Sequence, residues 1–395
     1  MNVHIMLDNF YTKRFMEYLA AYFPADEHAF IILSVDPHKC YVDRRDRAGM
    51  LVLDIWRPFF RLRYLNDSAI RAILDSASNV FIHFLNNWGS FILMRYCSND
   101  GKEGKGRRII WLPWGGDFYD FTELEQFSAE THKLMGPVSK SGTLKKVLKR
   151  KIFFDPWRKR AIARVDLIAG DFRSEYDIIK HHYDTGAEYR KFFYPNPLNF
   201  QKLRHVSEEA PADWPELDAV KECSKLVLVG NSGYPSNNHA DVLQMLSGIE
   251  SCDFGVVCPL SYGRPAYIEK VIAIGRELLG DRFVPLTEFM AADRYFQLLR
   301  KTDTAIMNHF RQQGKGNIIP LIYLGKKVYL REAVTTYREY AADGIRIEST
   351  DSLLSGNVRD MLTPYPDEIK ITNRNIITER YSDENARKNM ERLFK

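Results

Sequence analysis

LVLVGNSGYPSNNHADVLQML, residues 226–246, joins a short apolar run to a polar turn and then to a segment with helical apolar spacing. A short apolar run that ends at turn-forming residues is typical of a buried strand. Here the run ends at Gly230, and apolar residues recur with a helical period from about Ala240 onward. The stretch therefore predicts a strand, a loop and a helix in succession, the repeating unit of α/β folds.

The same alternation recurs along both halves of the chain. In the first half, predicted strands span 3–7, 29–35, 79–85, 108–114 and 167–171. In the second half, they span 225–230, 253–260, 282–286, 302–308 and 326–330. Predicted helices lie between the strands, at 12–22, 67–77, 121–134, 174–184, 239–248, 265–278, 290–301 and 316–324. Short strands that alternate with helices favour βαβ units, so each half is predicted to contain a parallel sheet.

The predicted organisation is two domains and a terminal helix. Segment 192–220 contains prolines and lacks periodicity, which favours a connection between the halves. We predict an N-terminal domain over 1–200, a C-terminal domain over 201–375 and a last helix within 376–395. Ligands of open α/β sheets bind at the carboxyl ends of the strands, so two such domains favour a cleft between them.

Composition excludes several classes of protein. The 395 residues are 45% hydrophobic and 27% charged, which is typical of a soluble globular protein. No apolar run approaches the roughly 18 residues that a bilayer-spanning helix needs, and the first residues do not resemble a secretory signal. The five cysteines form no CxxC pair, so we expect reduced core thiols in a cytoplasmic protein and no metal site.

Positive charge is concentrated in residues 140–164. This segment has ten Lys or Arg and one acid, a net charge of +9, which leaves −4 for the rest of a chain whose total is +5. Basic residues mixed with aromatic ones suit a helix on an anionic membrane surface, whereas a solvated surface helix is the alternative. Nothing resembles a nucleic-acid-binding module. The candidate membrane residues are Lys145, Lys146, Lys149, Arg150, Lys151, Phe153, Phe154 and Trp157.

The loop at residues 230–239 is a candidate phosphate site. Two glycines allow a tight turn close to a ligand, and the polar side chains offer donors and acceptors. A helix that starts near Asn238 would direct free N–H groups toward a phosphate. An ordinary strand-to-helix loop with an Asn cap is the alternative. The candidate residues are Gly230, Asn231, Ser232, Gly233, Ser236, Asn237 and Asn238.

A second polar loop follows the predicted strand 302–308 and precedes an apolar helix. It places glycines and two cations at the start of that helix. Helix N–H groups and a bidentate Arg311 would suit a diphosphate, whereas a surface loop with incidental charge is the alternative. The candidate residues are Arg311, Gln312, Gln313, Gly314, Lys315, Gly316 and Asn317.

Four stretches carry a resemblance to a known family. Three of them resemble the C-terminal half of the bacterial TDP-N-acetylfucosamine:lipid II N-acetylfucosaminyltransferases, a glycosyltransferase family 56-like group. These are LVGNSGYPSNNH, PLSYGRPAYIEKV and NHFRQQGKGNI. WLPWGGDFYDF, residues 111–121, resembles the Trp-Gly-x-Asp-x-Tyr segment of the same family. The similarity is densest from about residue 226 to 330, whereas the first 100 residues carry little of it.

The resemblance implies a GT-B architecture of two Rossmann-like domains facing across a cleft. The C-terminal domain would hold a TDP-linked deoxyamino sugar, and the N-terminal domain an undecaprenyl-diphosphate-linked saccharide as acceptor. The enzyme would then be a peripheral protein of the cytoplasmic face of the bacterial inner membrane. In GT-B proteins the last helix commonly packs back on the first domain, which is expected here for 376–395.

Two other functions remain open. One is a different GT-B enzyme, such as a transferase with a UDP- or GDP-linked donor or a sugar-nucleotide epimerase. The other is a non-catalytic protein that binds a nucleotide sugar at the membrane. The identity of the nucleotide base that binds would distinguish a different GT-B enzyme from the TDP-sugar transferase. Transfer activity would distinguish either enzyme from a non-catalytic binding protein.

Glycosyl transfer leaves negative charge on the departing diphosphate, so preorganised cations and N–H donors lower its barrier. Arg311, Lys315 and the helix from Gly316 are the candidates for this role. GT-B sites commonly work without a metal, so no cofactor is expected. The absence of a Glu-x₇-Glu pair favours inverting displacement. The family placement adds His239, Tyr262 and Glu288 to the candidate donor-binding residues.

An inverting enzyme also needs a general base that reaches the acceptor hydroxyl. Asp117, which follows a predicted strand in WLPWGGDFYDF, is the first candidate. Asp8, which follows the first predicted strand, is the second. A helix N-cap is the alternative role for Asp117.

Overall fold

The chain forms two compact units in the computed structural model, which describes residues 1–36, 38, 40–43, 49–97, 107–136, 155–195, 200, 214–249 and 253–395. Unit 1 comprises Met1–Glu123, Ser139–Pro197 and Asp383–Lys395. Unit 2 comprises Leu124–Val138 and Leu198–Ser382. The predicted domain ranges differ from these units at residues 124–138, 198–200 and 376–382, which group with unit 2.

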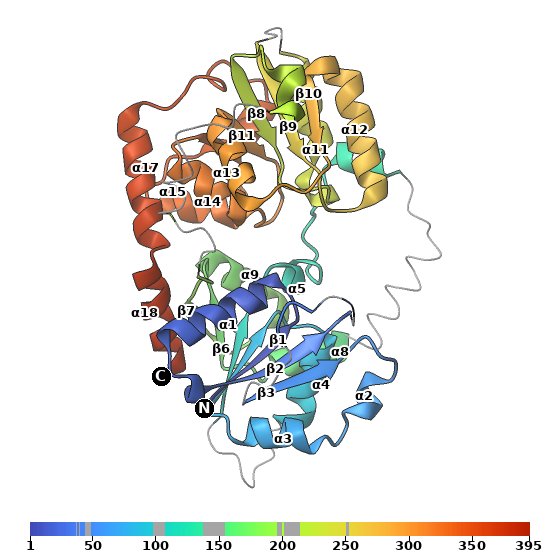
Figure 1. The fold of residues 1–395 in the computed structure, drawn as a ribbon, viewed down its shortest axis with the longest axis vertical. Coiled ribbons are helices and arrows are strands. Elements are labelled where there is room, and N and C mark those ends of the chain that lie inside the picture. The colour runs from blue at the N-terminus through green and yellow to red at the C-terminus, as the bar shows by residue number, and fades with distance from the viewer. Residues whose placement is uncertain are drawn as a thin grey trace. The chain divides into compact units, whose positions relative to one another are not determined.

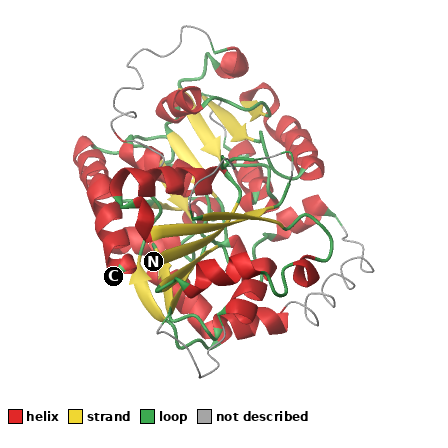
Figure 2. Ribbon diagram, turned by 60° about the horizontal axis from the view of Figure 1, so that its bottom comes forward, coloured by secondary structure: helices red, strands yellow, loops and turns green. Residues whose placement is uncertain are grey.

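Unit 1 contains a seven-stranded parallel sheet in the order β3-β2-β1-β4-β5-β6-β7 (Figure 1). Its strands are β1 (Asn2–Leu7), β2 (His28–Ser34), β3 (Met50–Asp54), β4 (Asn79–His83), β5 (Arg108–Leu112), β6 (Leu167–Gly170) and β7 (Glu188–Lys191). Its helices are α1 (Phe10–Tyr22), η1 (Ala25–Glu27), α2 (Phe60–Arg63), α3 (Ser68–Asp75), α4 (Asn87–Tyr96), α5 (Gly116–Tyr119), α8 (Asp155–Ile162), α9 (Arg173–Tyr183) and α18 (Asp383–Phe394). Helices cover both faces of this sheet (Figure 2).

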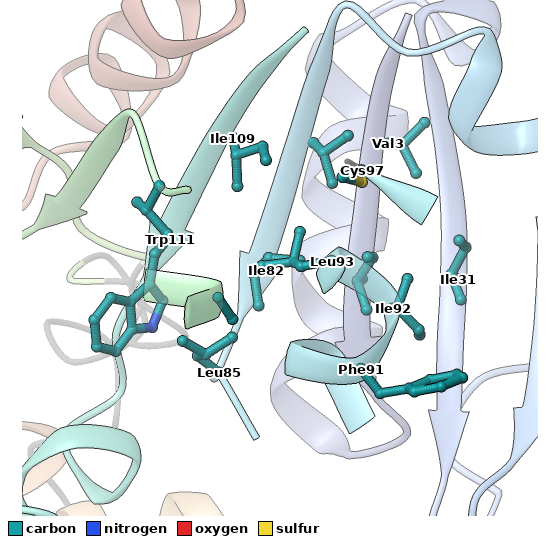
Figure 3. Packing of buried hydrophobic residues seen from close by; sticks show 14 of the residues in the cluster. Val3, Ile31, Ile82, Leu85, Phe91, Ile92, Leu93, Cys97, Ile109 and Trp111 are labelled. Atoms are coloured by element: carbon teal, nitrogen blue, oxygen red, sulfur yellow. The ribbon is translucent and has the colours of Figure 1, made fainter. Parts of the chain in front are cut away.

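The central strands of unit 1 are mostly apolar because both faces of the sheet are buried there. On one face, Phe91, Ile92 and Leu93 of α4 pack over Ile31 and Ile82 of the strands (Figure 3). The other face is covered partly by α18, whose Met390 and Leu393 join a core cluster with Met6, Phe15 and Ile32. The last helix is therefore part of the core of unit 1.

A chain of buried polar side chains crosses the same sheet. His4 Nε2 lies 3.0 Å from His28 Nδ1, and His4 Nδ1 lies 3.1 Å from His83 Nε2, on the neighbouring strands β2, β1 and β4. His83 Nδ1 lies 2.6 Å from the Tyr194 hydroxyl, which accepts a hydrogen bond from Trp114 Nε1 at 2.6 Å. These contacts satisfy polar atoms that burial would otherwise leave unpaired.

Unit 2 contains a six-stranded parallel sheet in the order β10-β9-β8-β11-β12-β13. Its strands are β8 (Lys225–Val229), β9 (Phe254–Pro259), β10 (Phe283–Leu286), β11 (Thr304–Met307), β12 (Lys327–Leu330) and β13 (Glu348–Ser349). Its helices are α6 (Ala129–Met135), η3 (Pro215–Val220), η4 (Pro235–Asn237), α11 (His239–Ser247), α12 (Pro265–Leu279), η5 (Gly280–Arg282), α13 (Ala292–Lys301), α14 (Lys315–Tyr323), α15 (Thr335–Ala342), α16 (Thr350–Leu354) and α17 (Asp367–Arg380).

The predicted helix at 121–134 begins too early. Residues 116–119 form the short α5, and a new helix, α6, begins only at Ala129. The Ser128 hydroxyl caps α6 by accepting from the Thr131 N–H at 3.1 Å, and the Glu125 carboxylate accepts the N–H groups of Gln126 and Phe127. These side-chain contacts replace helical hydrogen bonds, as Ser and acidic residues do at helix starts.

Both sheets reverse their strand order at one point. In unit 1 the strands that follow β1 in the chain lie to one side of it, and the strands from β4 onward lie to the other side. In unit 2 the same reversal lies between β8 and β11. Ligands of open parallel sheets bind outside the carboxyl ends of the strands at such a switch point. In the described part of the chain, no helix is long and apolar enough to span a bilayer.

Candidate functional site

The two predicted polar loops lie side by side at the switch point of unit 2. β8 and β11 are paired parallel, with Val229 opposite Ile306, so the segments that follow Val229 and Met307 leave the same edge of the sheet. The structure thus brings the 230–239 and 308–317 loops together, as parallel pairing of their strands requires.

Glycine is required at the start of the first loop. Gly230 has φ +70°, and a Cβ there would lie 2.8 Å from both Asn237 Oδ1 and His239 Nε2. Gly233 is equally crowded, since its Cβ would lie 2.2 Å from Ile268 Cγ1. These glycines allow the loop to pack against itself and against α12. The expected role of bringing the backbone close to a ligand is therefore not needed to explain them.

Asn237 and Asn238 bind the loops to one another. The Oδ1 of Asn237, a fully buried residue, accepts the Asn231 N–H at 2.8 Å and lies 2.9 Å from His309 Nε2. Asn238 and Asn308 exchange hydrogen bonds, each donating its side-chain amide to the other's carbonyl at 3.0 Å. The expected Asn cap is absent: Asn238 has left-handed backbone angles and its side chain does not cap α11.

The polar atoms of Ser236, Asn231 and Gln313 form a second set of contacts across the loops. The Ser236 hydroxyl donates to Gln313 Oε1 at 2.7 Å, and Gln313 Nε2 donates to Asn231 Oδ1 at 3.2 Å. Asn231 Nδ2 lies 3.4 Å from the hydroxyl of Tyr262, whose side chain is 55% exposed. Asn231, Gln313 and Tyr262 thus present hydrogen-bonding atoms from the loops after β8, β11 and β9. The Ser232 hydroxyl accepts from Asn237 Nδ2 at 3.0 Å and is buried.

The start of α14 has the features that an anion site needs. Gly314 has φ +74° and no side chain caps the helix, whose first residues are Lys315 and Gly316. Gly316 is exposed, and a Cβ there would meet no atom within 4 Å, so the backbone is open to approach. Uncapped helix N–H groups and adjacent cations favour bound phosphate. Asn317 instead donates to the Tyr295 hydroxyl at 2.8 Å and fixes α14 to α13.

A narrow gap lies beside this helix. Its polar lining residues are His309, Arg311, Gln313, Arg331 and Thr336, and apolar side chains line the rest. Arg331 pairs with Asp351 at 2.6 Å and donates its Nε to Asn308 Oδ1 at 2.6 Å, so its charge is offset within the protein. Arg311 and Lys315 are half-buried, and Gln312 follows on the same loop.

The two histidines of the site are neutral near pH 7. Burial lowers the pKa of His239 to about 3, and burial together with the Arg311 charge lowers the pKa of His309 to about 3. Glu288 follows the edge strand β10, two strands along from β8, and is exposed. The cluster of predicted donor residues therefore depends on Arg311 and Lys315 for positive charge.

Asp117 is enclosed by hydrogen-bond donors in unit 1. Its Oδ2 accepts the Leu85 N–H at 2.9 Å and Trp111 Nε1 at 2.8 Å, and its Oδ1 accepts the Trp114 N–H at 2.8 Å. Burial raises its pKa, while the neighbouring Arg158 opposes that shift, and the residue is only 1% exposed. This geometry favours a structural role, although the cap of α5 is Gly115 and not Asp117. Catalysis by Asp117 stays a prediction.

Asp8 follows β1 at the switch point of unit 1. Its Oδ1 accepts the N–H groups of Tyr41 at 3.0 Å and Val42 at 3.1 Å, and the residue is 3% exposed. Sequence reasoning missed the aromatic side chains at this edge of the sheet. The Trp114 ring lies 5.8 Å from Tyr11 and 5.9 Å from Phe84, between centroids. The available signal was that Phe84 and Trp114 stand at the ends of the predicted strands 79–85 and 108–114.

Most of the predicted membrane residues lie outside the described residues: Lys145, Lys146, Lys149, Arg150, Lys151, Phe153 and Phe154. Trp157 is described and is partly buried against the core of unit 1. Arg158, which belongs to the basic segment, is 1% exposed and donates to the backbone carbonyls of Leu85 and Asp117. Not all of the segment's charge is therefore available to a membrane. Among the described residues, no group of His, Cys, Asp or Glu could hold a metal ion.

Comparison with known proteins gives one family and one fold. The family described as 4-alpha-L-fucosyltransferase, glycosyl transferase group 56, matches residues 159–361, just over half of the chain. Sucrose-phosphate synthase from Thermosynechococcus elongatus is similar with a TM-score of 0.65 at 10% identity, over 100% of this chain and 98% of that one. WaaG, a glycosyltransferase involved in lipopolysaccharide biosynthesis, is similar with a TM-score of 0.56 at 11% identity, over 100% and 98%.

A UDP-N-acetylglucosamine 2-epimerase is also similar, with a TM-score of 0.51 at 15% identity, over 99% of this chain and 94% of that one. At such identities these likenesses show the fold alone. The predicted GT-B fold, with two Rossmann-like domains, is confirmed.

Proposed function

The chain belongs to the 4-alpha-L-fucosyltransferase family, glycosyl transferase group 56, and is a glycosyltransferase; from this premise we propose its donor and acceptor. The donor is a TDP-linked deoxyamino sugar of the N-acetylfucosamine type. The acceptor is an undecaprenyl-diphosphate-linked saccharide of cell-envelope polysaccharide synthesis. Transfer inverts the anomeric carbon and needs no metal. The enzyme works as a peripheral protein on the cytoplasmic face of the inner membrane.

One observation carries the donor proposal: two polar loops are cross-linked at the switch point of unit 2, beside the uncapped start of α14. Switch points are where α/β sheets bind nucleotides. The buried asparagine contacts hold the loops in one arrangement, so little ordering remains to oppose binding. The site is thus suited to a nucleoside diphosphate.

The proposed division of roles follows exposure. Arg311, Lys315 and the N–H groups of α14 bind the diphosphate and stabilise the charge that develops on it as the glycosidic bond breaks. Asn231, Gln313 and Tyr262 bind hydroxyl groups of the ribose or the donor sugar. The buried Asn237, Asn238 and His239 position these groups and do not contact the donor.

The aromatic residues of unit 1 support a saccharide acceptor. Tyr11 is 59% exposed, and its ring meets the edge of Trp114 close to the end of β1. Aromatic faces are apolar surfaces on which the C–H groups of a sugar ring can pack. Asp8 at the same strand end is the proposed general base, and Asp117 supports the loop that carries Trp114.

Thermal-shift measurements with TDP, UDP and GDP test the donor proposal. TDP should raise the melting temperature most, without added divalent cations. Arg311→Ala should remove most of that shift, because a charge-assisted hydrogen bond contributes about 1.5–3 kcal/mol. Arg276→Ala is the matched control, since Arg276 is an exposed arginine at the far end of α12.

Other outcomes select the alternatives. A larger shift with UDP or GDP would replace the TDP donor by another nucleotide sugar. Nucleotide binding without transfer to a lipid-linked acceptor would favour a non-catalytic binding protein. An Arg311→Ala variant that responds like wild type would remove Arg311 from the site.

A further inference from the structure

Residues 56–65, between β3 and α3, expose an unusual amount of apolar surface. Trp56 is 41% exposed, Phe59 76%, Leu62 71% and Leu65 41%. Single exposed apolar side chains are common, whereas four within ten residues form a patch of the kind that marks an interaction site. The segment includes α2, which lies at the periphery of unit 1 (Figure 1). We call these ten residues the 56–65 patch.

The structure fixes the patch in place on both sides. Phe60 points inward, is 6% exposed and packs with Tyr64 and Phe91, at ring distances of 4.9 and 5.7 Å. The Tyr64 hydroxyl accepts the Asp54 N–H at 3.2 Å, and Arg95 Nε donates to the Leu65 carbonyl at 2.7 Å. The outward direction of its neighbours is therefore set by an ordered backbone.

Phe59 has a backbone conformation that disfavours a bulky side chain. Its φ of 59° and ψ of 33° are left-handed, which only glycine and asparagine adopt readily. A residue that is both strained and exposed gains nothing for the fold from its aromatic ring. Strain of this kind is found where function requires it.

The charges within the patch are of one sign. Residues 55–66 contain Arg57, Arg61 and Arg63 and no acid. The nearest carboxylates in sequence are Asp54, which pairs with Arg57 at 3.4 Å, and Asp67, whose Oδ1 accepts the first N–H groups of α3. Arginines around exposed aromatic and aliphatic side chains match the phosphates and acyl boundary of an anionic bilayer.

The patch also continues into the basic segment 140–164. The Arg61 guanidinium lies 4.8 Å from the centre of the Trp157 ring, on α8. α8 is the described end of that segment, which carries a net charge of +9. The positive region of unit 1 therefore extends from α8 to the exposed apolar side chains of the patch.

We propose that the 56–65 patch is a membrane-docking surface that inserts Trp56, Phe59 and Leu62 into an anionic phospholipid bilayer. The arginines bind headgroup phosphates while the apolar side chains enter the acyl boundary. The inference rests on the proposed function, because docking would bring the enzyme to a lipid-linked acceptor. It differs from the sequence-based prediction, which assigned the membrane contact to 140–164 alone.

Co-sedimentation of the full chain with vesicles tests the proposal. Wild type should bind phosphatidylcholine vesicles that contain about a third phosphatidylglycerol, and bind pure phosphatidylcholine vesicles much less. Phe59→Ser with Leu62→Ser should weaken binding to the mixed vesicles at least tenfold, because two side chains no longer enter the bilayer. Arg57→Gln with Arg63→Gln should weaken it by about fivefold for each arginine.

Two further variants separate docking from folding. Phe59→Asn should raise the melting temperature, because asparagine tolerates the left-handed conformation, and should still weaken vesicle binding. Phe289→Ser is the matched control in unit 2, where Phe289 is 87% exposed, and should bind vesicles like wild type.

Equal vesicle binding by wild type and the Phe59→Ser, Leu62→Ser variant would overturn the proposal. So would a wild-type dimer in analytical ultracentrifugation that this variant loses, if neither protein binds vesicles, since the patch would then join two copies. The TDP-induced thermal shift is measured on the same samples. Its absence in wild type would contradict the proposed function and leave the vesicle result to decide the docking surface.

Discussion

Asp117 shows how far the role of a residue depends on contacts that the sequence does not reveal. Its position after a strand suggested a base, but three N–H donors from Leu85, Trp111 and Trp114 already occupy its carboxylate. A carboxylate in this position joins the end of β4 to the end of β5. Sequence shows that an acid follows a strand, but not what its oxygens contact.

Asp117→Asn should therefore lower stability more than activity. An amide directs an N–H₂ group at a backbone or indole donor, and an unsatisfied buried donor costs about 1–3 kcal/mol of unfolding free energy. The expected loss of melting temperature is about 2–4 °C for each kcal/mol. Circular dichroism measures it, with Asp177→Asn as the control because that carboxylate is 58% exposed. Unchanged melting with about 100-fold slower transfer would restore the general-base role.

The same distinction applies to the asparagines of the donor loop. Two of the residues that were predicted to bind a ligand, Asn237 and Asn238, are fully buried and bind the protein instead. Polarity was visible in the sequence, whereas the pairing of those polar atoms with each other depends on the tertiary structure. The half-buried Asn231 and Gln313 could not be told apart from them.

At the scale of elements, all ten predicted strands are present, because apolar runs between turn residues reflect burial on both faces of a sheet. The proximity of the two loops also followed from the strand pattern, since parallel strands end at one edge. The elements that were not predicted include β3, β7, β13, α4, α15 and α17. β7 is only four residues long and polar, and α4 is apolar on nearly every side, which hides its helical period.

The histidine chain across β2, β1 and β4 should make stability depend on pH. Burial lowers the pKa of His28 to about 4 and of His83 to about 3, and it lowers the pKa of His4 well below its ordinary value of 6.5. Between pH 6.5 and about 4 the unfolded chain binds protons that the folded chain does not. Stability is therefore complete above pH 6.5 and falls as the pH falls through this window.

The melting temperature should accordingly decrease from pH 7 to pH 5. Each such histidine contributes up to about 1.4 kcal/mol per pH unit. His28→Gln should reduce the decrease, whereas His132→Gln, at a side chain that is 52% exposed, should leave it unchanged. A pH dependence that is the same in wild type and His28→Gln would show that His28 does not titrate on unfolding.

At the scale of the whole molecule, the fold was accessible from sequence because two runs of alternating strands and helices allow few arrangements. Which residues belong to each unit was less accessible from the sequence. Residues 124–138 join unit 2 through contacts remote in sequence, such as the Ser128 N–H with Asn238 Oδ1 at 2.8 Å and Lys270 with the Leu134 carbonyl at 2.8 Å. Such contacts leave no local pattern.

Reversal of charge in the basic segment gives a prediction at this scale. The variant with Lys145, Lys146, Lys149, Arg150 and Lys151 changed to Glu should stay in the supernatant with anionic vesicles at low salt. Each basic residue near the surface contributes on the order of 1 kcal/mol of attraction, and added salt should release wild type by screening it. The TDP-induced thermal shift is the control and should persist. Equal sedimentation of both proteins would reduce the segment to a solvated surface helix.

The position of α18 in the core of unit 1 has a consequence for the order in which the protein is made. Residues 383–395 leave the ribosome after every residue of unit 2, yet Met390 and Leu393 cover Met6 and Phe15 from the start of the chain. Unit 1 is thus begun first and completed last. Domains usually fold in the order of their synthesis, but here the nascent unit 1 must wait with an apolar sheet face partly uncovered while unit 2 folds.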